Sequence, residues 1–190
     1  MKIIFISFFD NFGGTENFIQ NLVKKLNFKD VIIVSINNFD KRFKKYPKFK
    51  YISLNIKPGN NLISRVIYIF KVIKKIRKLI DQQNPTTFLS FKNRVNVLSS
   101  IAISSFPRLN SIACERTVVI EEQNIFWKLM RKLNYKNFKH IVTQDKFSSV
   151  WLKKNCLKLK DLNTIPNYLN LFKSSNKNKI FIKKNIKKKI

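Results

Sequence analysis

The sequence has 190 residues, which is enough to bury one core and short for two domains. Its 39 Lys and Arg residues against 10 Asp and Glu give a formal net charge of +29, which on its own would suggest a nucleic-acid or membrane partner. We discount that charge, because 32 of the basic residues are Lys and because Lys, Asn, Ile and Phe are abundant everywhere, as an AT-rich coding sequence would produce.

Short apolar runs alternate with segments of helical period up to about residue 166, and this alternation is typical of βαβ units. We therefore predict an α/β, Rossmann-like, doubly wound and mostly parallel sheet with helices on both faces. The predicted strands lie near residues 2–8, 31–36, 49–54, 87–91, 110–114, 139–143 and 162–165. The predicted helices cover residues 15–27, 61–82, 95–105, 122–135 and 145–155.

Two of the three glycines, Gly13 and Gly14, stand between the first strand and the first helix. Without a Cβ the backbone can turn sharply there, and a ligand can approach the N–H groups of the first helical turn, Thr15 included. Such N–H groups and the helix dipole favour anions, phosphate above all. The alternative is an ordinary strand-to-helix turn.

The predicted helix at residues 61–82 is amphipathic and strongly basic. We expect its apolar residues to share one face, with four lysines on the opposite face. A solvated lysine face on a core-packed helix is one interpretation, and contact with anionic lipid headgroups or a lipid-linked pyrophosphate is the other. The apolar residues are Leu62, Val66, Ile69, Phe70, Ile73, Ile76 and Ile80, and the lysines are Lys71, Lys74, Lys75 and Lys78.

Polar side chains follow two later strands, at the edge where doubly wound sheets bind ligands. Arg94 and Asn96 come after the strand near 87–91, and Arg94 either holds phosphate through paired hydrogen bonds or is a solvated residue at a helix start. Glu115 and Arg116 follow the next strand. A carboxylate there positions sugar hydroxyls or acts as a base, and a local ion pair between the two neighbours is the alternative.

Metal chemistry finds no support in the sequence. Cys114 and Cys156 lie far apart with no metal-ligand spacing, so we expect two free thiols. His140 begins a predicted strand instead of following one, so we expect a structural role for it. We predict no metal and no cofactor.

We expect no membrane-spanning segment, because no run of the sequence reaches the roughly 18 apolar residues that a span requires. The first apolar run suits a strand better than a signal peptide, so we expect a cytoplasmic protein, with peripheral contact at the inner face of the plasma membrane. Residues 1–170 are predicted to form the domain, and residues 171–190 a disordered basic Lys/Asn-rich tail.

Several short motifs resemble, in order, the N-terminal domain of glycosyltransferase family 4, whose enzymes have the GT-B architecture. The matching residues are Gly13-Gly14-Thr15-Glu16, FLSFKNRVNVLSS at 88–100, Cys114-Glu115-Arg116, HIVTQDKFSSVWLKKN at 140–155 and Ile165-Pro166-Asn167. Thr117 and Tyr168 depart from the family, which often has Asn and Pro there.

The resemblance implies an acceptor-side domain that faces a nucleotide-sugar-binding domain across a cleft. It implies Gly13, Gly14, Thr15, Arg94, Asn96 and Arg116 as substrate-binding residues and Glu115 as the candidate catalytic residue. The implied partners are a nucleotide-sugar, which serves as co-substrate, a lipid-linked or polysaccharide acceptor, an anionic membrane surface, and a donor-binding domain or subunit that this sequence lacks.

Two other readings remain open. The first is a basic module that binds nucleic acid through its lysines and tail, although its aromatic residues lie in the apolar runs where a core is expected. The second is an inactive remnant of a longer gene.

Overall fold

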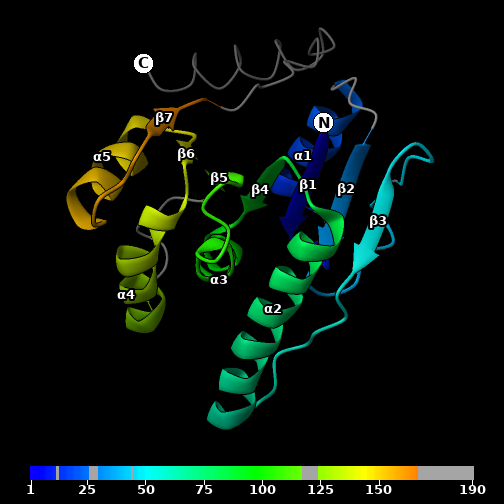
Figure 1. The fold of residues 1–190 in the computed structure, drawn as a ribbon, viewed down its shortest axis with the longest axis horizontal. Helices are drawn as coiled ribbons and strands as arrows, with labels where there is room; N and C mark the ends of the chain where they lie inside the picture. The colour runs from blue at the N-terminus through cyan, green and yellow to red at the C-terminus, as the bar shows by residue number, and fades with distance from the viewer. Residues whose placement is uncertain (12, 26–29, 44, 117–123, 167–190) are drawn as a thin grey trace, which may run out of the picture.

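The computed structural model describes residues 1–190 apart from residues 12, 26–29, 44, 117–123 and 167–190. Figure 1 shows a central sheet with helices packed on it. The strands are β1 (Lys2–Ser7), β2 (Asp30–Ser35), β3 (Lys50–Ser53), β4 (Thr87–Phe91), β5 (Asn110–Glu115), β6 (His140–Thr143) and β7 (Leu162–Thr164). The helices are α1 (Gly14–Lys25), α2 (Leu62–Gln83), α3 (Asn93–Ile103), α4 (Ile125–Asn134), the 3-10 turn η2 (Tyr135–Asn137) and α5 (Lys146–Asn155).

The seven strands form one parallel sheet in the order β3-β2-β1-β4-β5-β6-β7. In register, Ile4 of β1 lies between Ile32 of β2 and Phe88 of β4. From β1 the chain adds β2 and then β3 on one side. The helix α2 then returns the chain to β4, which pairs with β1 on its other side. The point where strand order reverses, between β1 and β4, is the position at which such sheets bind ligands.

Two apolar clusters cover the two faces of the sheet. One face carries α1, whose Ile19 and Val23 pack on β1 and β2. The other face carries the remaining helices, and side chains such as Val72 of α2, Leu98 of α3 and Leu152 of α5 join its core. The predicted doubly wound α/β fold is confirmed, since every predicted strand and helix is present in order.

The central strands are apolar on both faces, which explains why the sequence reads as short uninterrupted runs. All of the side chains from Ile3 to Ile6 in β1 are buried. Parallel strands covered by helices on both sides have this pattern, whereas a half-exposed strand would alternate with polar residues.

The predicted apolar face of α2 is wrong for the first half of the helix. Leu62 is 77% exposed and Phe70 is 68% exposed, and Val66 is exposed as well. The helix begins well beyond the carboxyl ends of the strands, so its first turns have no sheet beneath them (Figure 1). The face that packs on the core comprises Tyr68, Val72, Ile73, Ile76, Leu79 and Ile80.

The positions of the two cysteines and of His140 can be compared with the expectations for them. Cys114 and Cys156 are buried free thiols, as predicted. His140 lies at the start of β6, where its Nδ1 is 2.7 Å from Oδ2 of Asp161. Among the described residues, no group of His, Cys, Asp and Glu is placed to hold a metal ion. None of the described helices has the length and apolarity to cross a bilayer. The tail at 171–190 and the motif end at Asn167 lie outside the described residues.

Candidate substrate site at the carboxyl edge of the sheet

The adjacent strands β1, β4 and β5 bring the predicted site residues to one edge of the sheet. Gly13 and Gly14 follow β1, Arg94 follows β4, and Arg116 follows β5. Because the three strands are parallel, their carboxyl ends meet at this edge, as the sequence predicted. The site is therefore built from three successive strand ends around the point of reversal between β1 and β4.

The glycines open the first helix without unusual backbone geometry, since neither has a positive φ. A Cβ built on Gly14 meets nothing within 4 Å, whereas one on Gly13 meets Oε2 of Glu16 at 3.3 Å. Gly14 therefore leaves open space at the N-terminus of α1, where the N–H groups of Gly14 and Thr15 have no acceptor within the helix.

The N–H group of Gly13 is not bare, in contrast to our expectation. It donates to Oε2 of Glu16 at 3.0 Å, so the side chain of Glu16 caps its own helix in the manner of a capping box. Glu16 is 1% exposed, and its Oε1 lies 2.5 Å from Nζ of Lys92. An internal carboxylate therefore occupies the position at which an anion was predicted to meet Gly13, and Gly14 and Thr15 remain for a ligand.

Lys92 is a rim residue that our sequence analysis did not single out. It precedes α3 with φ 71, a left-handed conformation that is uncommon for a residue with a side chain. Besides its ion pair with Glu16, its Nζ donates to the backbone oxygen of Phe8 at 3.1 Å. Lys92 thus ties the end of β4 to the end of β1 and the start of α1. Its place in the motif at 88–100 was the only signal in the sequence.

The two arginines lie on the rim with their guanidinium groups against aromatic rings. Arg94 is exposed, and its guanidinium carbon is 5.7 Å from the ring centroid of Trp127. Arg116 is half-buried, and its guanidinium carbon is 3.6 Å from the ring centroid of Phe18 in α1. Burial lowers the pKa of Arg116. One of its terminal nitrogens is buried without a hydrogen-bond partner among the described residues, and the rest of the half-buried side chain reaches the surface of the rim.

Glu115 and Asn96 lie beneath the rim instead of on it. Glu115 is 1% exposed and Asn96 is fully buried. The Tyr135 hydroxyl donates to Oε1 of Glu115, and Nδ2 of Asn96 donates to the backbone oxygen of Cys114 at 3.3 Å. Burial raises the pKa of Glu115, while Tyr135, the Arg131 charge and Asn96 oppose that rise. In this structure the two side chains support the end of β5 and are closed to a ligand.

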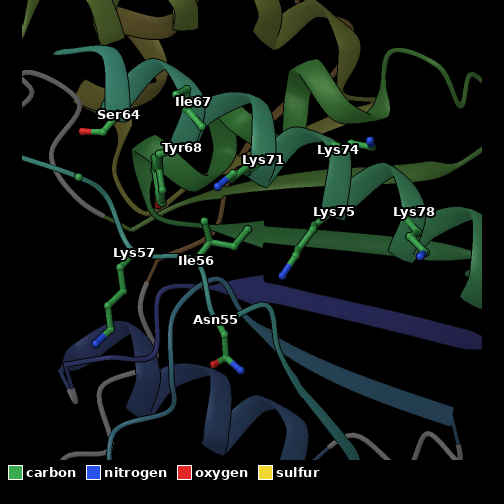
Figure 2. A pocket seen from close by; sticks show the side chains of 11 residues that line it. Asn55, Ile56, Lys57, Ser64, Ile67, Tyr68, Lys71, Lys74, Lys75 and Lys78 are labelled. Carbon is green, nitrogen blue, oxygen red and sulfur yellow. The ribbon is translucent and has the colours of Figure 1, made fainter. Parts of the chain in front are cut away.

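A basic groove lies beside α2. It has a volume of about 710 Å³ and separates α2 from the segment that follows β3. Tyr68 lines the groove, and the charges of Asp10 and Arg94 at the rim are close enough to influence the pKa of its hydroxyl. The four lysines predicted to face a membrane all line this groove, together with Lys57 (Figure 2).

No protein-family model matches this sequence, and no curated protein matches it. Solved structures do share its fold. The lipopolysaccharide outer core galactosyltransferase WaaB matches with a TM-score of 0.68 and 12% identity over 89% of this chain and 46% of its own. The fold is that of one half of a GT-B protein.

Two further solved structures with this fold come from proteins of different kinds. HepE from Anabaena, solved with UDP and glucose, matches with a TM-score of 0.61 and 14% identity over 98% of this chain and 50% of its own. The UDP-N-acetylglucosamine 2-epimerase of Rickettsia bellii matches with a TM-score of 0.60 and 16% identity over 86% of this chain and 44% of its own. The chain therefore spans about half of each of these three proteins.

Proposed function

We propose that this chain is the acceptor-side half of a glycosyltransferase that moves a sugar, of hexosyl or N-acetylhexosaminyl type, from a nucleotide-sugar to a lipid-linked or polysaccharide precursor. The observation that supports it is the set of anion-binding groups at the point of strand reversal: the open N-terminus of α1 at Gly14, and Arg94 and Arg116 on the neighbouring strand ends. A leaving nucleoside diphosphate gains negative charge during transfer, so fixed N–H groups and cations at this edge lower the barrier without a metal.

The proposed roles follow from where each residue lies. Gly14, Thr15 and Arg116 contact the phosphate oxygens of the nucleotide-sugar. Arg94, which is exposed, attracts the nucleotide-sugar from the solvent side. Glu115, the predicted catalytic residue, together with Asn96 holds the end of β5 and so positions Arg116. Gly13 acts through its hydrogen bond to Glu16, which sets the start of α1. A donor-binding domain or subunit completes the cleft, since this chain spans only half of the related structures.

We also propose that the free end of α2 rests on an anionic membrane, at the inner face of the plasma membrane. The exposed apolar side chains of its first turns suit the boundary between headgroups and acyl chains. Lysines near such a surface contribute about 1 kcal/mol of attraction each. The four lysines expected to meet the membrane, Lys71, Lys74, Lys75 and Lys78, follow along the helix but line the groove, so the proposed membrane contact rests on the exposed apolar side chains.

Epimerisation of a free nucleotide-sugar is the competing function, because the epimerase fold is also similar. The two functions differ in their products. A transferase attaches the labelled sugar to an acceptor, whereas an epimerase releases an isomer of the donor. The basic groove beside the site favours the transferase, since isomerisation needs no acceptor.

The test uses membranes from cells that carry the gene and from matched cells that lack it, each incubated with a panel of radiolabelled UDP-sugars. We expect one labelled glycan or glycolipid to disappear on deletion and to return when the gene is restored. The purified chain alone is expected to turn over no UDP-sugar. Identical labelled products with and without the gene would refute the proposal. A labelled isomer of the UDP-sugar that disappears on deletion, with no change in labelled glycans or glycolipids, would establish the epimerase.

A further inference from the structure

The groove beside α2 is a concave and strongly basic site. Its lysines occur at positions 71, 74, 75 and 78, so they form one stripe along the helix. From Ser64 to Lys78 the helical wall of the groove is about 21 Å long at the rise of an α-helix. The opposite wall is the segment from Asn55 to Gly59. The groove therefore has the shape of a channel for an extended ligand.

The lysine charges are uncompensated within the described part of the chain. None of the ion pairs found there involves a groove lysine. Lys75 is tied to the wall, because its Nζ donates to the backbone oxygen of Leu54 at 2.6 Å. Figure 2 shows Lys71 and Lys75 extending from α2 toward the segment that carries Asn55 and Ile56. The ammonium groups of Lys71 and Lys75 thus extend toward the opposite wall, and none of the ion pairs found in the described residues neutralises them.

Tyr68 supplies a second and independent feature of a binding site. Its side chain is 9% exposed and lines the groove. Burial raises the pKa of its hydroxyl to about 12, so the group is protonated at neutral pH and can donate a hydrogen bond.

The groove wall is held close to the helix by Gly59. A Cβ on Gly59 would lie 2.1 Å from Oγ and 2.3 Å from Cβ of Ser64, which no side chain tolerates. The loop after β3 therefore packs directly on the first turn of α2, whose Asn61 side chain caps the helix by accepting from the N–H of Ser64 at 2.7 Å. The cavity is shaped by packed backbone and is more than a patch of surface lysines.

From these features we infer that the groove binds the phosphate groups of an anionic acceptor, a ligand with two or more phosphates along an extended chain. That the ligand is an acceptor rests on the proposed transferase function. Binding of phosphate groups in the groove does not depend on a sugar donor. A flat bilayer meets only the outer edge of a channel, whereas a single chain or headgroup enters it and reaches Tyr68 and Lys71.

The experiment measures binding of inorganic tripolyphosphate to the full chain by calorimetry, with no nucleotide-sugar present. The double variant Lys71→Gln/Lys78→Gln is compared with Lys153→Gln/Lys154→Gln, which removes the same charge from exposed positions on α5. We expect the groove variant to bind at least about tenfold more weakly and Tyr68→Phe about fivefold more weakly. The α5 variant is expected to stay within about twofold of the wild type.

Vesicles separate the two sources of phosphate. Loss of binding to cardiolipin vesicles, whose headgroup has two phosphates, by both the groove variant and Tyr68→Phe would place a lipid headgroup in the groove. Loss of tripolyphosphate binding alone would indicate a soluble phosphate-bearing chain, and both outcomes support the inference. Equal losses in the groove and α5 variants would overturn it. So would a single-stranded oligonucleotide that displaces tripolyphosphate at a lower phosphate concentration. Because no donor is present, none of these outcomes depends on sugar transfer.

Discussion

Replacing Arg131 with Met is expected to lower the free energy of unfolding by about 3 to 5 kcal/mol, because it removes the positive charge beside a buried carboxylate. Arg131 has no exposed surface, and its guanidinium carbon is 5.0 Å from the ring centroid of Trp151. Its charge favours the ionised form of Glu115. A change of that size is a large share of the stability of an ordinary domain. Chemical denaturation followed by circular dichroism measures it.

The matched control is Arg65→Met, which removes the same charge from an exposed position on α2 and is expected to change stability by less than about 0.5 kcal/mol. The double variant Glu115→Gln/Arg131→Met should recover part of the loss, since no charge is then buried alone. Equal stability of the Arg131→Met and Arg65→Met variants would contradict a structural role for the Glu115 cluster.

The same cluster makes stability depend on pH with a defined sign. Burial raises the pKa of Glu115 above its ordinary value of 4.5, so the folded state holds the proton more tightly than the unfolded state. The stabilising contribution is complete below pH 4.5 and is lost as the pH rises through the folded-state pKa. Relative to Glu115→Gln, the wild type should therefore lose stability as the pH rises above 4.5.

Replacing Arg116 with Ala is expected to lower incorporation of the labelled sugar by about 10-fold to 150-fold, the loss that follows when one charged hydrogen bond to phosphate is removed. The reason is the position of Arg116 directly after β5, at the carboxyl edge of the sheet, where its side chain is half-buried. Its contact with Phe18 adds a smaller loss of stability, about 0.5 to 1 kcal/mol for a cation over an aromatic ring.

Arg116→Lys is the matched variant, because it keeps the charge but not the planar fork that binds two phosphate oxygens. We expect it to recover the stability of the wild type more fully than its transfer rate. Membranes from cells that produce each variant, with protein amounts equalised, provide the measurement. Transfer rates that follow the stability of the variants alone would show that Arg116 only packs against α1.

The fold could be predicted from the sequence because its signals are local. The uninterrupted apolar run of β1 and the apolar stripe of α1 with Ile19 and Val23 indicate burial by themselves, and these residues are buried in the structure. The carboxyl ends of parallel strands meet at one edge of a sheet, which is why Gly14, Arg94 and Arg116 could be assigned to that edge from the sequence. The order of the strands, with β4 beside β1, comes from the structure.

Other features depend on contacts that no sequence period encodes. The apolar residues of α2 repeat with helical spacing throughout, yet the sheet ends before the first turns of the helix, so Leu62 and Phe70 are exposed. The lysines of α2 were predicted on an outer face, but the loop after β3 makes them one wall of a groove. The pairing of Glu16 with Lys92 joins residues 76 positions apart, and only the adjacency of β1 and β4 reveals it.

The central claim is that the carboxyl edge of β1, β4 and β5 is the ligand-binding surface, and amide chemical-shift mapping with UDP-glucose tests it most directly. Added to the isotope-labelled chain, the nucleotide-sugar is expected to shift the N–H signals of Gly14 and Thr15 and the guanidinium signal of Arg116. Shifts confined to the opposite edge, around Asp30 or His140, would contradict the claim, as would a spectrum that does not change up to several millimolar ligand.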